Sequence, residues 1–199
     1  MNAGEDDRRD VARARDGDDV VGDELHVTRF ATPWGAMTIT STERGLLSCS
    51  LPGCDDASAL RHAEKHAGGA SSTPLPRVDA IGRNTDAVRA VLAYLTGESR
   101  TFDLPLDVRG TDFQRDVWRT LVDVPFGATV TYAELGARAG HASAVRAVGM
   151  ACGANPLPLF VPCHRVVAAN GLGGFAGGLE LKRRLLAWER GGGERGLFG

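Results

Sequence analysis

Cys163 and His164 are neighbours in the chain, held between Pro162 and the short apolar run Val166-Val167. A free cysteine has a pKa of about 8.5, so a nearby imidazolium or helix N-terminus is needed to populate the nucleophilic thiolate at neutral pH. A buried cysteine beside a surface histidine is the more common arrangement for such a pair. The pair therefore indicates a nucleophile only if the surrounding sequence supports the same chemistry.

The surrounding sequence does support it. The run from Asn155 to Val167, NPLPLFVPCHRVV, closely resembles the active-site segment of the O6-alkylguanine-DNA alkyltransferases, the methylated-DNA–protein-cysteine methyltransferases. The resemblance is strong over residues 108–190 and much weaker over residues 25–107. It implies DNA repair in which a methyl or larger alkyl group moves from O6 of guanine in duplex DNA, and also from O4 of thymine, onto Cys163.

The resemblance also implies roles for the residues around this cysteine. His164 would accept the thiol proton, through a water in this family, Glu189 would orient His164, and Asn155 would brace the active-site turn. Glu180 is a rival to Glu189 on spacing alone, but the residues before Glu189 align with the end of the family's last helix. The thioether product has no activated leaving group, so each molecule should react once. No cofactor and no metal ion is implied.

A substrate pocket is expected on both sides of Cys163. Phe175 stands at an aromatic position of the family's pocket, within the glycine-rich run 171–178. Many relatives have a serine where this chain has Ala176, so one side-chain hydrogen bond to guanine would be missing. Backbone N–H groups are expected to read the guanine edge. The pocket residues implied are Pro162, Val166, Phe175 and Ala176.

Two capping boxes precede the active-site segment, beginning at Thr111 and at Thr131, and each predicts the start of a helix. The second helix should end at Gly140, and another short helix, 144–153, should follow with Ser143 as its cap. This pair has the form of a helix-turn-helix. Compact helix pairs that bind no DNA are at least as common, so the pattern alone does not decide.

The second helix of this pair is rich in small residues, so its backbone could lie close to another surface. The resemblance places it in the minor groove, with Arg146 filling the gap left by a flipped nucleotide and Tyr132 acting at that nucleotide's phosphate and on the departing oxygen. Flipping is needed because guanine O6 is enclosed in the stacked pair. Otherwise Tyr132 would be a core-edge aromatic and Arg146 a solvated charge. The small residues expected at the DNA are Ala144, Ala147, Gly149 and Gly153.

The whole chain predicts an α/β protein: a small N-terminal domain with an antiparallel sheet plus helix, and a mostly helical C-terminal domain containing the helix-turn-helix. The expected divisions are a disordered acidic tail (1–23), the N-terminal domain with its linker (24–107), the catalytic and DNA-binding domain (108–190) and a flexible tail (191–199). The last helix is expected to bury Leu181, Leu185 and Trp188 and to leave Lys182, Arg183 and Arg184 in solvent.

Composition restricts the setting. The 199 residues include four cysteines, no apolar run approaching the roughly 18 residues of a membrane span, and no apolar signal-peptide core, so we expect a reduced cytoplasmic setting and no membrane. The net charge of −2 is uneven, with −5 over residues 1–24 and +4 over residues 108–190. That balance permits a phosphate-binding face. The expected partner is duplex DNA containing alkylated guanine, bound by a monomer.

Three alternatives remain open. Cys49, Cys54, His62 and His66 could be drawn as a zinc site, although no Cys-x-x-Cys pair supports one. The chain could be a sensor that binds alkylated DNA without repairing it, although such relatives lack the nucleophile that is present here. It could also be a hydrolase with a Cys-His-Glu triad, which would turn over acyl substrates.

Overall fold

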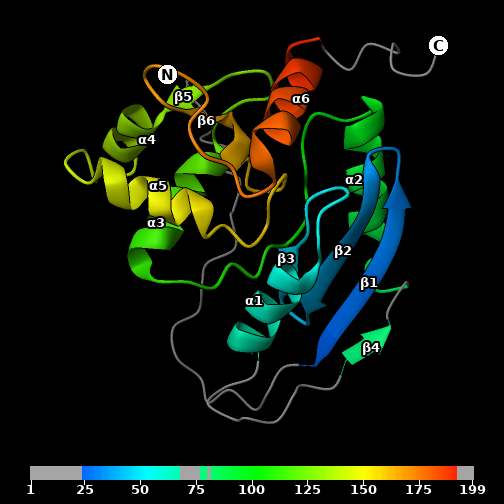
Figure 1. The fold of residues 1–199 in the computed structure, drawn as a ribbon. Coiled ribbons are helices and arrows are strands. Elements are labelled where there is room, and N and C mark those ends of the chain that lie inside the picture. Colours follow the sequence, from blue (N-terminus) through cyan, green and yellow to red (C-terminus); the bar gives the residue numbers. More distant parts are fainter. Residues whose placement is uncertain (1–23, 68–76, 80–81, 192–199) are drawn as a thin grey trace, which may run out of the picture.

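The structure is a computed structural model that describes residues 24–67, 77–79 and 82–191. We call residues 24–107 the N-terminal region and residues 108–191 the C-terminal region. The predicted tails, 1–23 and all but the first residue of 191–199, lie outside the described residues. Figure 1 shows a sheet with flanking helices formed by the N-terminal region, and a mostly helical C-terminal region beside it.

The N-terminal region contains a four-stranded sheet and two helices. Its strand order is β3-β2-β1-β4, in which β1, β2 and β3 form the predicted antiparallel meander and β4 adds a parallel edge strand that was not expected. Helix α1 contacts β2 and β3, and α2 contacts β1. The elements are β1 (Leu25–Thr32), β2 (Gly35–Thr42), β3 (Gly45–Cys49), α1 (Ala57–Ala67), β4 (Arg77–Asp79) and α2 (Thr85–Thr96).

The segment that follows α2 is tied to the sheet. The Leu46 N–H donates to the Pro105 carbonyl at 2.9 Å, and the Asp107 N–H donates to the Leu46 carbonyl at 2.8 Å. The Thr42 hydroxyl adds a 2.7 Å bond to the Asp107 carboxylate. The chain therefore enters the C-terminal region alongside β3.

The C-terminal region begins with the two predicted capping boxes, both of which form. The predicted cap at Ser143 is wrong, because the Ala144 N–H bonds to the His141 carbonyl and closes a turn that contains Ser143. The next helix has Ala144 as its N-cap residue, with no side-chain cap. The elements are α3 (Asp112–Val122), β5 (Val130–Thr131), α4 (Tyr132–Arg138), α5 (Val145–Gly153), η1 (Cys163–Arg165), β6 (Val166–Val167) and α6 (Gly178–Arg190).

Helix α6 differs from expectation at one position. Leu185 is buried, Leu181 and Trp188 are partly buried, and the two arginines at 183 and 184 are exposed, but Lys182 is fully buried rather than solvated. Its ammonium group donates to the carbonyls of Val166 (2.6 Å), Leu172 (2.5 Å) and Gly174 (3.1 Å). A buried ammonium is tolerated only when its donors are satisfied, and these three carbonyls match its three N–H groups.

One buried apolar cluster extends through both regions. It joins Met37 and Ile39 of the sheet, Val91 of α2, Trp118 of α3 and Leu157 of the active-site segment, among others. The Trp118 indole also donates to the Ala151 carbonyl at 2.8 Å, which fixes α5 against α3. Among the described residues, no helix is long and apolar enough to cross a membrane.

Candidate active site

Cys163 begins the single turn η1, between a buried proline-containing run and the short strand β6. The whole stretch 156–166 is buried, and Cys163 itself is 8% exposed. Strand β6 pairs with β5 in parallel, with Val166 opposite Val130. Because Tyr132 comes directly after β5, this pairing brings the start of α4 next to the cysteine.

Asn155 braces this run from within. Its side-chain NH₂ donates to the Val161 carbonyl at 2.7 Å, and its side-chain oxygen accepts from the Leu157 N–H at 3.0 Å. Between them Leu159 adopts a φ of 76°, in the left-handed region that a leucine rarely occupies. A strained residue persists only where its surroundings hold it, and the amide bridge together with burial supplies that constraint.

His164 follows the cysteine in the η1 turn and is fully buried. Its Nε2 is 2.7 Å from Oε1 of Glu189, so Nε2 carries the proton in the neutral ring. Nδ1 is buried and has no hydrogen-bond partner within the described part of the chain. Burial lowers the pKa of His164 and Glu189 acts to raise it. The ring therefore presents a free lone pair at Nδ1, which can accept a proton.

Glu189, which sequence reasoning paired with His164, has three further hydrogen-bond partners that the sequence did not reveal. Arg165 donates to both carboxylate oxygens at 2.9–3.1 Å, Tyr94 donates its hydroxyl to Oε1 at 2.6 Å, and the Gly127 N–H donates to Oε2 at 2.9 Å. Burial alone would raise the pKa of Glu189, but the hydrogen bonds from His164 and Arg165 lower it to about 2. The carboxylate therefore stays ionised throughout the physiological range.

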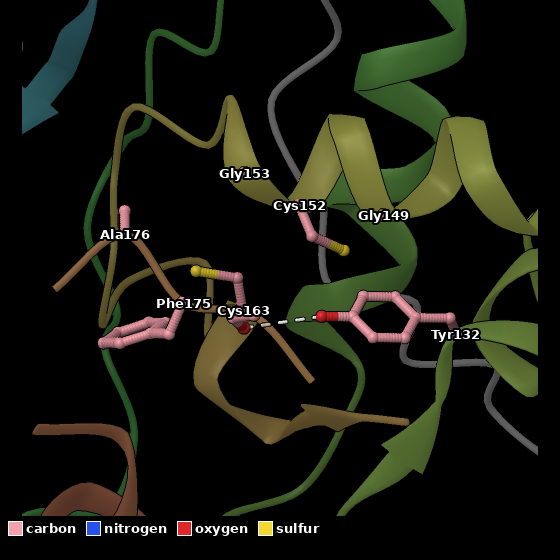
Figure 2. A pocket seen from close by; sticks show the side chains of 8 residues that line it. Tyr132, Gly149, Cys152, Gly153, Cys163, Phe175 and Ala176 are labelled. Carbon is pink, nitrogen blue, oxygen red and sulfur yellow. Dashed lines mark hydrogen bonds between the residues drawn. The ribbon is translucent and has the colours of Figure 1, made fainter. Parts of the chain in front are cut away.

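A pocket of about 190 Å³ opens above Cys163, and Figure 2 shows its walls. Tyr132 closes one side and bonds through its hydroxyl to the Gly174 carbonyl at 3.4 Å, while Phe175 lies on the opposite side of the cysteine. Pro162 and Val166 flank the η1 turn and are buried, and they are not among the lining residues. Those are Tyr132, Gly149, Cys152, Gly153, Cys163, Gly174, Phe175 and Ala176.

Comparison with known proteins identifies this arrangement. A family model described as "6-O-methylguanine DNA methyltransferase, DNA binding domain" matches residues 112–191. The crystal structure of Mycobacterium tuberculosis OGT in complex with DNA superposes with a TM-score of 0.68 at 34% identity, covering 84% of this chain and 94% of that one. The chain belongs to the methylated-DNA–protein-cysteine methyltransferase family.

Two curated relatives show how far the likeness extends. The methylated-DNA–protein-cysteine methyltransferase of Mycolicibacterium paratuberculosis is 50% identical over 105 residues, which are 52% of this chain and 64% of that protein. The regulatory protein ada of Salmonella typhimurium is 40% identical over 171 residues, 84% of this chain and 47% of its own length. The match to ada and the structural match both extend well beyond residues 108–190, where the resemblance was strong.

The predicted DNA-binding residues of this family member lie on or beside α5. Figure 2 shows α5 passing over the pocket, with Gly149 and Gly153 on its near side. Arg146 is exposed on the same helix, whereas Ala144 and Ala147 are partly buried. Helix α4 packs against α5, and Gly140, with a φ of 82°, makes the left-handed turn between them.

Cys152 is a pocket residue that the sequence did not single out, because no histidine or acid stands next to it. It projects from α5 into the pocket that also contains Cys163. Burial, reinforced by Cys163, raises the pKa of Cys152 to about 12. Burial also raises the pKa of Cys163, while the Asn155 amide and the Lys182 ammonium act to lower it. Cys163, unlike Cys152, is followed in the chain by a histidine.

The four side chains considered for zinc do not converge. The Cys49 thiol donates to the Pro158 carbonyl at 3.1 Å, whereas His62 and His66 stack on each other with ring centroids 4.3 Å apart. Burial lowers the pKa of His62 to about 4. In the described ranges, no three His, Cys, Asp or Glu side chains are grouped so that they could hold a metal ion.

Proposed function

We propose that this protein repairs DNA by moving an alkyl group from O6 of guanine onto Cys163, once per molecule. The observation that carries this proposal is the pocket itself. Cys163 lines it as a buried thiol with an aromatic side chain on each side, and the next residue in the chain, His164, has a ring nitrogen, Nδ1, without a partner among the described residues. The match to the family along most of the chain supports the same activity.

The transfer begins with the Cys163 thiol, which burial keeps protonated at rest. Nδ1 of His164 accepts the thiol proton, through a bridging water in this family, and Glu189 stabilises the resulting imidazolium. The thiolate attacks the alkyl carbon in line with the carbon–oxygen bond. A carbon–sulfur bond forms, the carbon–oxygen bond breaks, and the electron pair of that bond stays on the base.

The departing oxygen needs a proton or a hydrogen bond, and Tyr132 is placed to supply it. Burial raises the pKa of the Tyr132 phenol, so the hydroxyl remains a donor at neutral pH. The thiol proton that reaches His164 is balanced by the proton that the guanine gains. The product is a thioether and unmodified guanine, and nothing among the residues at the site would cleave the thioether.

DNA would reach the pocket along α5. The target nucleotide must leave the stack to expose O6, at a cost of a few kcal/mol. Arg146 projects from α5 to occupy the vacated space, and the small residues at 149 and 153 let the nucleotide backbone approach the pocket opening. We expect the protein to act as a monomer in the cytoplasm on duplex DNA that contains alkylated guanine.

Lys182 supports the pocket wall. Its three carbonyl partners belong to β6 and to the loop that carries Phe175, so the ammonium group ties the wall of the pocket to the strand that follows the nucleophile. Its charge also favours the thiolate of Cys163.

Ala176 offers no hydroxyl to the base, so backbone groups near Phe175 would read guanine. O4 of alkylated thymine is proposed as a second substrate.

An active-site titration tests this function. The protein is incubated with a duplex that contains one O6-methylguanine, at several ratios, and then digested. We expect one methyl per molecule on the peptide that contains Cys163, none from Cys163→Ala, and unchanged DNA binding by that variant. Cys152→Ala, which alters the same pocket, is the matched control and should still accept one methyl.

Other outcomes would reject the proposal. Binding to the methylated duplex without transfer would indicate a sensor of alkylated DNA. Turnover of acyl esters without any dependence on alkylation would indicate a Cys-His-Glu hydrolase. Repeated turnover on DNA, or a methyl on Cys152, would contradict the mechanism.

A further inference from the structure

Tyr94 belongs to α2 in the N-terminal region, yet it bonds to Glu189, the carboxylate proposed to stabilise His164. Its side chain is completely buried, and its hydroxyl donates to Oε1 of Glu189 at 2.6 Å. The backbone is held as well, because the Trp188 indole donates to the Tyr94 carbonyl at 3.2 Å. The ring packs against Phe102 and Phe126 at centroid distances of 5.1 and 5.9 Å.

The hydroxyl is not needed to hold the carboxylate in place. Arg165 already grips both oxygens of Glu189, and the Gly127 N–H fixes Oε2. Tyr94 instead binds the oxygen that His164 uses, since both contact Oε1. A strong hydrogen bond to one carboxylate oxygen reduces the negative charge that the oxygen presents to a second partner.

We propose that Tyr94 is a positioning residue for the transfer reaction, which acts through Glu189 and limits how strongly that carboxylate stabilises the His164 imidazolium. This inference rests on the proposed function. Because Tyr94 and His164 share Oε1 of Glu189, the N-terminal region adjusts the basicity of His164. The basicity of His164 in turn sets how readily Cys163 loses its proton. Without the hydroxyl, Oε1 would stabilise the imidazolium more strongly.

The other charged groups around the ring leave this effect intact. Arg165 and Lys182 both oppose a positive charge on His164, and Glu189 favours it. Neither Arg165 nor Lys182 changes when the Tyr94 hydroxyl is removed. Burial raises the pKa of Tyr94 far above neutral, so the phenol remains a donor across the pH range of an assay.

Tyr94→Phe tests the inference, because it removes the hydroxyl and keeps the ring. The reaction rate with free O6-benzylguanine is measured from pH 6 to pH 9, where its rise with pH reports the fraction of Cys163 present as thiolate, which grows when His164 holds the thiol proton more tightly. We expect the rise to move to lower pH by on the order of half a unit, about threefold in rate at neutral pH. Glu189→Gln should move the rise in the opposite direction.

Phe102→Leu is the matched control, because it loosens the packing of Tyr94 without touching the hydroxyl. It should lower the melting temperature and leave the pH profile in place. An unmoved profile or a shift to higher pH in Tyr94→Phe would overturn the inference. The same shift in Phe102→Leu would also overturn it, since packing alone would then account for the effect.

Reaction of the Cys163 thiol with iodoacetamide separates failure of this inference from failure of the proposed function. Iodoacetamide reacts with the thiolate form of Cys163. Alkylation at Cys163, read by mass spectrometry of its peptide, therefore reports the thiolate fraction without DNA or guanine. If the wild-type protein takes no methyl from DNA but Tyr94→Phe still moves the iodoacetamide profile to lower pH, the proposed function fails and the role of Tyr94 stands. If transfer proceeds and neither profile moves, only the role of Tyr94 fails.

Discussion

The two regions of this molecule contribute to the site in different ways. Every described residue that lines the pocket belongs to the C-terminal region, which also supplies His164 and Glu189. The N-terminal region instead reaches the site from behind, where Tyr94 bonds to Glu189 and Cys49 bonds to the run before the nucleophile. The side chains proposed to react belong to the C-terminal region. Their positions and their charge depend on contacts from both regions.

The contact made by Cys49 shows how direct this support is. Its N–H donates to the Pro156 carbonyl at 2.8 Å and its thiol donates to the Pro158 carbonyl. Leu159, in its left-handed conformation, comes immediately after this pair. Strand β3 and Asn155 thus both hold this strained run by hydrogen bonds to its carbonyl groups. An enzyme can store strain next to its nucleophile only when neighbouring elements oppose its release.

The largest effect should come from the acid inside the C-terminal region. Glu189→Gln replaces the charge that stabilises the His164 imidazolium by a neutral amide, so transfer should slow by about a hundredfold, within the range usual for acid–base catalysis. The rise in rate with pH should move to higher pH, as single-turnover kinetics from pH 6 to pH 9 would reveal. Glu180→Gln, on the exposed first turn of α6, is the control and should behave as wild type. The reverse pattern would transfer the role to Glu180.

A substitution at Arg146 should distinguish nucleotide flipping from the alkyl transfer step, both of which are proposed for the C-terminal region. Arg146→Ala removes the side chain proposed to fill the vacated stack, so repair of duplex DNA should slow about tenfold to a hundredfold. Reaction with free O6-benzylguanine should be nearly unchanged, because a free base needs no flipping. Arg183→Ala removes an exposed arginine from α6 and serves as the control. Equal losses on both substrates would mean that Arg146 supports the fold or the pocket.

Cys49 tests whether the N-terminal region has the indirect role inferred from its contacts. Cys49→Ala removes a buried hydrogen bond and a small buried volume, so unfolding should become easier by about 1–2 kcal/mol and transfer should slow severalfold. Cys49→Ser keeps a donor for the Pro158 carbonyl and should recover part of the rate. Chemical denaturation and single-turnover assays give the two quantities. A change in stability with no change in rate would confine Cys49 to holding the fold.

The smallest effect concerns pH and stability, and it involves a histidine in each region. The pKa values of His62 and His164 are both lowered by burial, that of His62 to about 4, so the folded state binds fewer protons than the unfolded chain. The stability due to these neutral rings is complete above about pH 6.5 and is lost as the pH falls toward 4. His62→Gln should flatten the decline measured by urea unfolding between those pH values. An unchanged slope would contradict the assignment to His62.

Predictions from the sequence agreed best with the structure where they depended on residues close together in the chain. The two capping boxes and the antiparallel strands of the N-terminal region were both recovered. The run around Cys163 and the glycine-rich loop led to the family, and the comparisons confirm that membership. Each of these signals lies within a few neighbouring residues, whose spacing and backbone preferences are written directly in the chain.

Apart from the local error at Ser143, the errors and omissions lie where the contacting residues are far apart in the sequence. Lys182 was expected in solvent because lysine is almost never fully buried, and only the folded loop supplies its three carbonyls. Tyr94 is 95 residues from Glu189, and no periodicity within α2 marks its hydroxyl as a partner for that carboxylate. The sequence by itself pointed to Cys163 as the candidate nucleophile, to the two capped helices before it and to the family. Tertiary structure alone decided which buried polar groups surround that nucleophile, because hydrogen bonds between distant elements depend on packing that no local pattern encodes.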